Sequence, residues 1–320
     1  MKTETLAWLA CPGCGSRLSG EGVGESENTT LTCENHHRWP VVRGIPRFTG
    51  EERTATIEAD SIQRSFGSEW DAYDYSGDRV WGQELSTRRE IALRELDCAP
   101  EDLEGKLVLD AGCGTGRDTA LLLDQLPRGH VTAVDASATM LSRLRERLAG
   151  HTDRLTVFQA DLSSPLLDLA RPVTAVFSVA TLHWVPDHAK VFRNLAAVTA
   201  PGAQLAFECG GHGNIRTVLD AVQRATGDAS AKIGWNFAGP VETERLLVEN
   251  GFVDVQARLR DAPARLAATE LHDYLRTVIL GRHLAPLAPE ERSRFVDAVA
   301  AVMPEPVIDY VRLEVTARRK

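Results

Sequence analysis

The stretch that decides the fold runs Val108-Leu-Asp-Ala-Gly-Cys-Gly-Thr-Gly-Arg-Asp118. An apolar run over 106–110 precedes three alternating glycines, and a helical pattern over 117–126 follows them. Because glycine has no Cβ, the backbone of such a turn can approach a ligand at the N-terminus of the helix. The stretch therefore predicts a ligand site at a junction of strand, turn and helix.

Strand and helix patterns alternate after this junction. The sequence predicts strands at 130–135, 155–160, 173–179 and 204–209, and helices at 138–149 and 189–198. Alternation of this kind is typical of an α/β fold with a parallel sheet and helices on both faces. We therefore expect a Rossmann-like, doubly wound, mostly parallel sheet of seven strands, the last two being 252–259 and 307–317.

The final third is less regular and contains four prolines between 286 and 306. We expect helices near 215–226, after Pro240, at 269–281 and at 289–302. This order predicts an antiparallel edge strand, with a helical insertion at about 260–306 between the last two strands.

Three acidic residues follow consecutive predicted strands or stand at their ends: Asp110, Asp135 and Asp161. The spacing Gly-x-Gly-x-Gly differs from the dinucleotide fingerprint Gly-x-Gly-x-x-Gly, which does not require an acid before it. Asp110 suits a cationic ligand, Asp135 the two hydroxyls of a ribose, and Asp161 an exocyclic adenine amine. Together they indicate S-adenosylmethionine.

Residues 104–209 resemble a class I S-adenosylmethionine-dependent methyltransferase. The likeness rests on the glycine turn, on Asp135 and Asp161, on the segment Phe177-Ser-Val-Ala-Thr-Leu-His-Trp-Val-Pro-Asp187, and on Pro201-Gly202. It implies that the glycines lie beside the methionine part, Asp135 on the ribose, Met140 and Leu162 near adenine, and Ser178 near the amine. The implied cofactor residues are Asp110, Gly112, Gly114, Gly116, Asp135, Ala136, Met140, Asp161, Leu162, Ser178 and Val179.

Two further segments resemble the trans-aconitate methyltransferase group. They are Leu182-His-Trp-Val-Pro-Asp187 and Gly210-Gly-His-Gly-Asn214, and a weaker likeness extends through Asp309-Tyr310. The resemblance implies a small-molecule acceptor, but the group is too broad to name one.

A cluster of cysteine and histidine stands near the N-terminus. Cys11-x-x-Cys14 is followed, 18 residues later, by Cys33-x-x-x-His37. Four such ligands on two turns predict a structural zinc ion, since a site with four protein ligands leaves no position for water. The neighbouring His36 is the alternative fourth ligand.

The same segment resembles the zinc knuckle of ribosomal RNA guanine-N1 methyltransferases and, over 39–48, the zinc-ribbon activator subunit of tRNA and protein methyltransferases. This likeness implies His37 as the fourth ligand. It also raises a rival function, an rRNA or tRNA base methyltransferase whose ribbon contacts RNA through Arg38, Arg43 and Arg47.

The pattern predicts three parts: a zinc ribbon at 1–50, a helical connector or lid at 51–100, and the methyltransferase domain at 101–320. The connector contains Trp70, Tyr73, Tyr75 and Trp81. These side chains either cover the acceptor or serve as a plain hydrophobic connector. A second candidate for the acceptor wall is Trp235-Asn236-Phe237.

The chemistry of the acceptor decides whether a base is needed. A phenol, amine or activated carbon calls for one, and His183 is the first candidate and His212 the second, with a structural role for His183 as the alternative. A carboxylate needs none, and an arginine such as Arg88, Arg89 or Arg216 would orient it. The sequence does not decide between these alternatives, nor between methylation of oxygen, nitrogen and carbon.

Composition sets the outer limits. The 320 residues carry a formal net charge of −9, which disfavours a nucleic-acid partner. No stretch reaches the roughly 18 apolar residues of a membrane span, and we expect a cytoplasmic enzyme of specialised metabolism. A catalytically silent binding partner is a third hypothesis, and the oligomeric state stays open.

Overall fold

The computed structural model describes residues 3–24, 27–49, 105–151, 153–165, 169, 171–227 and 234–320. The predicted lid at 51–100, with Trp70, Tyr73, Tyr75 and Trp81, lies outside these ranges, as do Arg88 and Arg89.

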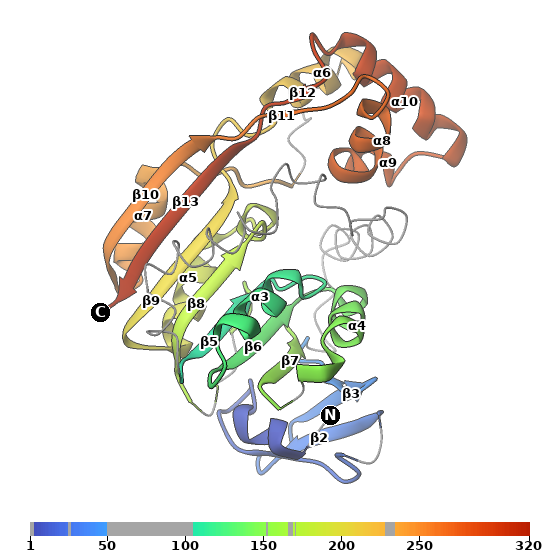
Figure 1. Cartoon of the computed structure of the whole chain (residues 1–320). Coiled ribbons are helices and arrows are strands. Elements are labelled where there is room, and N and C mark those ends of the chain that lie inside the picture. The colour runs from blue at the N-terminus through green and yellow to red at the C-terminus, as the bar shows by residue number, and fades with distance from the viewer. Residues whose placement is uncertain are drawn as a thin grey trace.

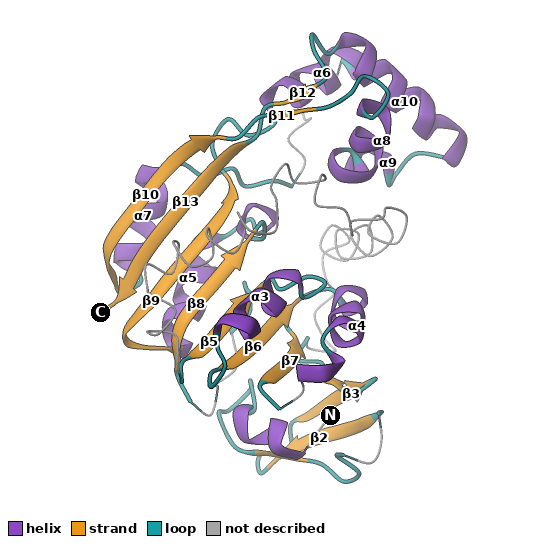
Figure 2. Ribbon diagram, viewed as in Figure 1, coloured by secondary structure: helices purple, strands orange, loops and turns teal. Residues whose placement is uncertain are grey.

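A seven-stranded sheet forms the centre, in the order β10-β13-β9-β8-β5-β6-β7 (Figures 1 and 2). Strands β5 to β9 are parallel to one another, whereas β13 is antiparallel to both β9 and β10. This confirms the predicted fold class. The strands are β5 (Leu107–Ala111), β6 (His130–Asp135), β7 (Leu155–Gln159), β8 (Val173–Val179), β9 (Thr199–Gly210), β10 (Phe252–Asp261) and β13 (Val311–Arg319).

Helices cover the two faces of this sheet, with α3 on one face and α5 and α7 on the other (Figure 1). One apolar cluster joins α3 and α4 to the sheet through Leu123 and Leu144, and another joins α5 through Phe192. Burial on both faces explains why β5 and β6 are almost continuously apolar. The helices are α3 (Arg117–Gln125), α4 (Ala138–Arg147), α5 (His188–Val198) and α7 (Pro240–Glu249), with short 3₁₀ turns η4 (Ala149–His151) and η5 (Leu182–Trp184).

A helical lobe lies beyond the carboxyl ends of β8 and β9 (Figure 1). It has its own apolar cluster, centred on Leu275, Val299 and Tyr310. It comprises α6 (Arg216–Thr226), α8 (Leu271–Tyr274), the π-helix η6 (Leu275–Ile279), α9 (Gly281–Leu284), α10 (Pro289–Val302) and the strand pair β11 (Ala264–Arg265) and β12 (Val307–Ile308). Most of the lobe is inserted between β10 and β13, where the sequence predicts an insertion.

Residues 3–49, here called the N-terminal module, form a separate four-stranded antiparallel sheet beside β7 (Figure 1). Its elements are η1 (Thr3–Trp8), β1 (Leu18–Ser19), β2 (Thr29–Cys33), β3 (Arg38–Val42) and β4 (Ile45–Pro46). Its apolar residues Leu18, Leu31 and Val41 belong to the same cluster as the α5 face of the large sheet. The module therefore shares its core with the rest of the chain.

Buried ion pairs hold the antiparallel edge of the sheet. Glu314 on β13, 5% exposed, accepts hydrogen bonds from Arg258 and Arg260 of β10, and Arg260 also bonds Glu208 of β9 at 2.9 Å. These arginines hold the pKa of Glu314 below its usual value despite its burial.

Replacing Glu314 by Ala should lower the free energy of unfolding by about 2 kcal/mol, because the charge-assisted hydrogen bonds from Arg258 and Arg260 are lost while both guanidinium groups keep access to water. The control is Glu305→Ala, which removes the exposed pair with Arg265 and should cost less than about 1 kcal/mol. Urea unfolding measures both. Equal losses would show that the buried network does not stabilise this edge.

Candidate functional site

The glycine turn joins β5 to α3, and its three glycines serve different purposes. Gly112, Gly114 and Gly116 have φ values of 84°, 52° and 78°. A Cβ on Gly112 would lie 2.1 Å from the side chain of Thr181, and one on Gly116 would lie 2.6 Å from Leu144. A Cβ on Gly114 would meet nothing within 4 Å. Gly112 thus allows Thr181 to pack against the turn and Gly116 allows Leu144 to do so, while Gly114 faces open space.

Asp135, at the end of β6, fixes the turn from the neighbouring strand. One carboxylate oxygen accepts the Gly114 N–H at 2.9 Å, and the other accepts the Ser137 N–H at 2.8 Å. Burial raises the pKa of Asp135, while these bonds act to lower it. The Ala136 N–H also bonds this carboxylate, which offers about four acceptor positions, so acceptor capacity remains for a ligand hydroxyl group.

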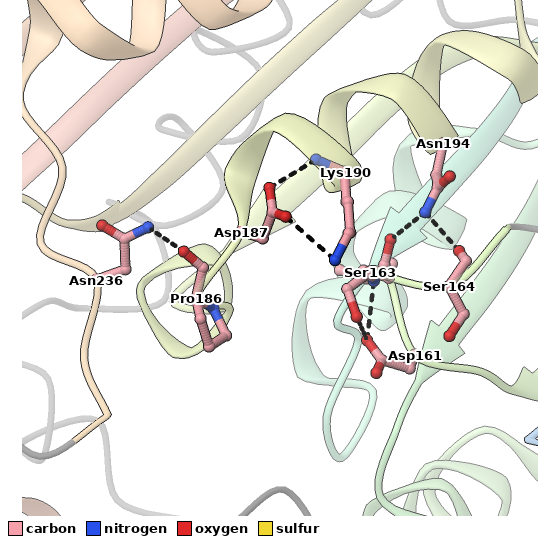
Figure 3. A network of polar contacts seen from close by, with 9 residues as sticks. Asp161, Ser163, Ser164, Pro186, Asp187, Lys190, Asn194 and Asn236 are labelled. Atoms are coloured by element: carbon pink, nitrogen blue, oxygen red, sulfur yellow. Dashed lines mark hydrogen bonds and ion pairs between the residues drawn. The ribbon is translucent and has the colours of Figure 1, made fainter. Parts of the chain in front are cut away.

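Asp161 follows β7 at the same edge of the sheet. One of its oxygens accepts both the N–H and the hydroxyl of Ser163, each at 2.8 Å (Figure 3). Asn194 of α5 donates to the carbonyls of Leu162 and Ser164 and so holds the same loop. The loop that carries Asp161 is therefore fixed from both sides.

The other predicted adenine residues surround this edge. Met140 on α4 and Leu162 are buried, at 5% and 5% exposure. The carbonyl of Ala136 accepts the side-chain amide of Gln159 at 2.8 Å. This hydrogen bond ties the segment after β6 to the end of β7, and no local sequence pattern indicates it.

Two predicted cofactor residues instead have partners within the protein. Asp110 is 2% exposed and accepts the Thr119 hydroxyl at 2.5 Å, and burial raises its pKa to about 7. The Ser178 hydroxyl donates to the Ala111 carbonyl at 2.7 Å, and Val179 is partly buried at the end of β8. These contacts support a role for Asp110 and Ser178 in joining β5 to α3 and β8, and their contact with a ligand stays a prediction.

His183 lies in η5, just beyond β8, and its ring is buried. The Gly210 N–H donates to its Nδ1 at 3.1 Å, which leaves the proton of the neutral ring on Nε2. Burial lowers the pKa of His183 to about 3, and Arg312, His188 and Arg282 contribute. The only acceptor nitrogen of this ring is thus occupied, so the contacts favour the structural alternative over a general base.

Aromatic rings extend from His183 towards the helical lobe. Its ring centroid lies 5.0 Å from that of Trp184 and 6.1 Å from that of Phe237, and Trp235 stacks on Phe237 at 5.7 Å. The segment 234–239 is fastened to η5, because the Asn236 N–H donates to the His183 carbonyl at 2.9 Å. The predicted aromatic wall at 235–237 therefore stands beside the carboxyl end of β8.

Arg282, which sequence reasoning missed, completes this wall from α9. Its guanidinium carbon lies 4.9 Å above the Trp184 ring. Gly234 has a φ of 74°, which favours glycine, and a Cβ there would lie 1.5 Å from one of the Arg282 nitrogens and would displace the guanidinium. The preceding helix η6 is a π-helix, a feature often found at functional sites. Arg282 is about a hundred residues from His183 in sequence, so no local motif could have paired them.

Two other predicted candidates lie elsewhere. His212 is exposed and lines an open surface depression with Gly239, Glu242 and Arg245. Arg216 is exposed at the start of α6. Both side chains are exposed, whereas His183 is buried.

The N-terminal module brings the four predicted metal ligands together. The donor atoms of Cys11, Cys14, Cys33 and His37 all lie within 4.8 Å of one another. Nδ1 of His37 is 3.4 Å from the sulfur of Cys11 and 3.5 Å from that of Cys33, and the sulfurs of Cys14 and Cys33 are 3.6 Å apart. Ligands around tetrahedral zinc are separated by about 3.6–3.8 Å.

The surroundings of this cluster also suit a cation. The Trp39 indole N–H donates to the Cys11 sulfur at 3.4 Å. Hydrogen bonds from Asn35 and Ser16 lower the pKa of Cys14 to about 5, which favours the thiolate that binds metal. His36 has a left-handed backbone, with φ 61°, and is not in the cluster. The residues present fit a structural zinc ion with His37 as the fourth ligand.

The sheet order, the reversed strand β13 and the glycine turn between β5 and α3 define a class I methyltransferase fold. A family model described as a methyltransferase domain matches residues 108–202. Haemonchus contortus phosphoethanolamine N-methyltransferase 2, solved with S-adenosyl-L-methionine, has the same fold, with a TM-score of 0.52 and 15% identity over 91% of this chain and 63% of that chain.

Curated relatives agree with this class. Trans-aconitate 2-methyltransferase of Methylobacterium radiotolerans is 30% identical over 60% of this chain and 75% of its own length. That of Rhodopseudomonas palustris (strain BisA53) is 40% identical over 32% of this chain, but only 37% of the relative is covered. The chain belongs to the class I S-adenosylmethionine-dependent methyltransferases.

Replacing Gly114 by Ala should weaken binding of S-adenosylmethionine by more than about tenfold, because the new methyl group enters the open side of the turn. The matched control is Gly202→Ala. Gly202 also has a positive φ, 77°, and open space around it, but lies near the start of β9, at the other end of the sheet. Both variants carry a similar backbone strain of about 1–2 kcal/mol.

Calorimetric titration with S-adenosylmethionine and thermal unfolding measure the two effects separately. The melting temperatures of the two variants should fall together, while the affinity falls only in Gly114→Ala. An unchanged affinity in Gly114→Ala would remove the turn from the cofactor site.

His183 should stay neutral between pH 5 and 8, with its proton on Nε2. Because its folded pKa of about 3 lies below the unfolded value of about 6.5, its contribution to stability is present above about pH 6.5 and is lost progressively as the pH falls towards 3. Nitrogen-15 NMR of the imidazole rings, with His183→Gln to assign the signal, measures both tautomer and titration. A midpoint near 6.5 would restore His183 as a candidate base.

Proposed function

We propose that this protein transfers the methyl group of S-adenosylmethionine to a small carboxylic acid. The observation that carries the proposal is the hydrogen bond from Gly210 to Nδ1 of His183. It leaves the histidine nearest the predicted transfer site without a basic nitrogen. An acceptor that is already ionised at neutral pH needs no base, and a carboxylate is such an acceptor.

The charges beside the aromatic wall support an anionic acceptor. The positive charges of Arg282 and Arg312 both lower the pKa of His183, so both guanidinium groups lie near its ring. Glu208 offsets part of this charge, since it is paired with Arg260 at 2.9 Å and with Arg312 at 3.8 Å. A guanidinium over an indole ring can orient a carboxylate by two parallel hydrogen bonds.

The names of the relatives point to the same chemistry. Trans-aconitate is a small polycarboxylate, and the related chain from Methylobacterium radiotolerans is named for methylating it. We propose a small carboxylic acid as the acceptor and not trans-aconitate itself, because the 30% identity does not extend over the whole of either chain.

The residues of this chain position the reactants. Asp135 and Asp161 hold the nucleoside, and Gly114 leaves room for the cofactor beside the turn. Arg282 presents the acceptor, so that a carboxylate oxygen attacks the methyl carbon in line with the departing sulfur. S-adenosylmethionine supplies the electrophilic methyl group, and such positioning accounts for much of the lowering of the barrier. The aromatic rings exclude water.

Zinc has a structural role in this proposal. The four donors Cys11, Cys14, Cys33 and His37 would occupy all four positions of a tetrahedral zinc ion. Two of the cysteines are buried in the core of the N-terminal module. The chemistry that zinc supplies there is the joining of two turns of a small fold.

The RNA alternative loses one of its three arginines. Arg47 is partly buried, its Nε is enclosed, and burial together with Arg43 lowers its pKa. Only Arg38 and Arg43 remain exposed, on a chain with a formal net charge of −9. A place in specialised metabolism and in the cytoplasm stays a prediction. Among the described residues, no helix is long and apolar enough to cross a membrane.

The test follows the methyl label from S-adenosylmethionine into separated fractions of a cell extract. With zinc-loaded protein, the label should enter small organic acids and be released as methanol by mild alkali, since methyl esters hydrolyse readily. Label in RNA would support the rival function. Label in an alkali-stable product would exclude a carboxylate acceptor, and cofactor binding without transfer would indicate a silent partner.

Two variants refine the test. Arg282→Gln should raise the KM for the acid by roughly tenfold or more, as expected for loss of a charge-assisted hydrogen bond. Its affinity for S-adenosylmethionine should not change. Arg276→Gln is the control in the same lobe, because Arg276 is exposed and paired with Asp273.

A further inference from the structure

The N-terminal module is joined to the large sheet at the carboxyl end of β7, beside the predicted adenine site. Arg47 forms a parallel bridge with Gln159, and the Phe48 N–H donates to the Gln159 carbonyl at 2.9 Å. Residues 47–48 thus pair with the last residue of β7, whose outer edge is otherwise the end of the sheet (Figure 1). Two residues beyond Gln159 stands Asp161.

A short chain of contacts leads from this junction to the second cofactor carboxylate. The Gln159 side chain donates to the carbonyl of Ala136, the residue after Asp135, at 2.8 Å. The Ala160 N–H donates to the carbonyl of Asp135 itself at 3.2 Å. Gln159, which contacts the module, therefore bonds the residue after Asp135 and lies two residues before Asp161.

The apolar contacts follow the same route. Phe48 is 7% exposed, and its ring lies 5.6 Å from Trp39 of the module and 5.9 Å from Phe158 of β7, edge-on in both cases. Trp39 in turn bonds the sulfur of Cys11. One metal ligand is thus linked through two aromatic rings to the strand that carries Asp161.

The helix that carries Met140 is held as well. Arg145 of α4 donates to the carbonyl of Arg43, and Ile45 belongs to the apolar cluster of Leu141 and Leu144. At the amino end of β6, on the opposite side of the sheet edge, Trp8 stacks on His130 with ring centroids 4.0 Å apart. The module therefore contacts two elements on the adenine side, β7 and α4.

We propose that the metal-loaded N-terminal module sets the affinity of the enzyme for S-adenosylmethionine, by fixing the end of β7 and the segment after β6. This inference rests on the proposed zinc and cofactor sites. Gln159 acts as a positioning residue in it. Metal binding at the module and nucleoside binding at the sheet edge are then two coupled equilibria, and thermodynamic linkage requires the coupling to be reciprocal.

The first experiment titrates S-adenosylhomocysteine into the full chain, zinc-loaded and after removal of zinc by a chelator. Zinc removal should weaken binding by a factor within the range of about 5–150 that is usual for coupled sites. Because loss of zinc also threatens the fold of the module, a second variant is needed. Phe48→Ala leaves all four ligands in place and should retain zinc, yet bind S-adenosylhomocysteine about tenfold more weakly.

Gln159→Met should do the same, since methionine keeps the shape of glutamine but cannot donate to Ala136. Arg38→Ala is the matched control, an exposed change on β3 of the module away from this junction. Its zinc content and its affinity should equal those of the unchanged protein.

Reciprocity supplies a readout independent of the cofactor titration. Saturating S-adenosylhomocysteine should tighten zinc binding, measured against a chromophoric chelator, by the same factor that zinc tightens S-adenosylhomocysteine, and this effect should vanish in Phe48→Ala. Zinc-loaded Phe48→Ala with unchanged affinity, or zinc binding indifferent to S-adenosylhomocysteine, would overturn the inference and leave the proposed function intact. Failure of the zinc-loaded protein to bind S-adenosylhomocysteine would overturn both.

Discussion

The parallel register of β5, β6 and β7 is the constraint on which the site depends. Ala111 pairs with Val134, and Asp135 pairs with Gln159, so the residues that follow each strand reach the same edge of the sheet. The hydrogen bond between the Gly114 N–H and Asp135 then locks the glycine turn to that register. A shift of one residue in either pairing would move a carboxylate to the opposite face. The positions of the predicted site residues are thus set by the strand register of the sheet.

Periodicity was sufficient to predict the sheet, because buried parallel strands are short apolar runs with clear ends. Strands β6 and β8 begin and end where expected. The last strand did not follow its pattern. Its apolar run breaks at Asp309 and Tyr310 into β12 and β13, because Asp309 accepts from the N–H and hydroxyl of Thr217 and so caps α6. Such a contact, 92 residues apart in sequence, has no local signal.

The candidate site divides in the same way. The glycines, Asp135, Asp161 and the four metal ligands stand in short motifs whose spacing reflects one turn or one strand end. Arg282, Gln159 and the tautomer of His183 depend on contacts between distant segments. Histidine type and position suggested a base, but only the Gly210 N–H shows which nitrogen carries the proton. Sequence therefore predicts where a ligand binds better than how an acceptor is activated.

The position of the N-terminal module bears on the choice between its two readings. A module that recognises RNA must present its basic residues to solvent; Arg38 and Arg43 of this module are exposed, whereas Arg47 and Phe48 lie in the junction with β7. An edge strand with unpaired backbone groups invites association with other chains, and natural sheets cover such edges. Covering β7 also fixes the residues that end it. The position of the module therefore supports the proposal that it serves the edge of the sheet and the proposed nucleoside site.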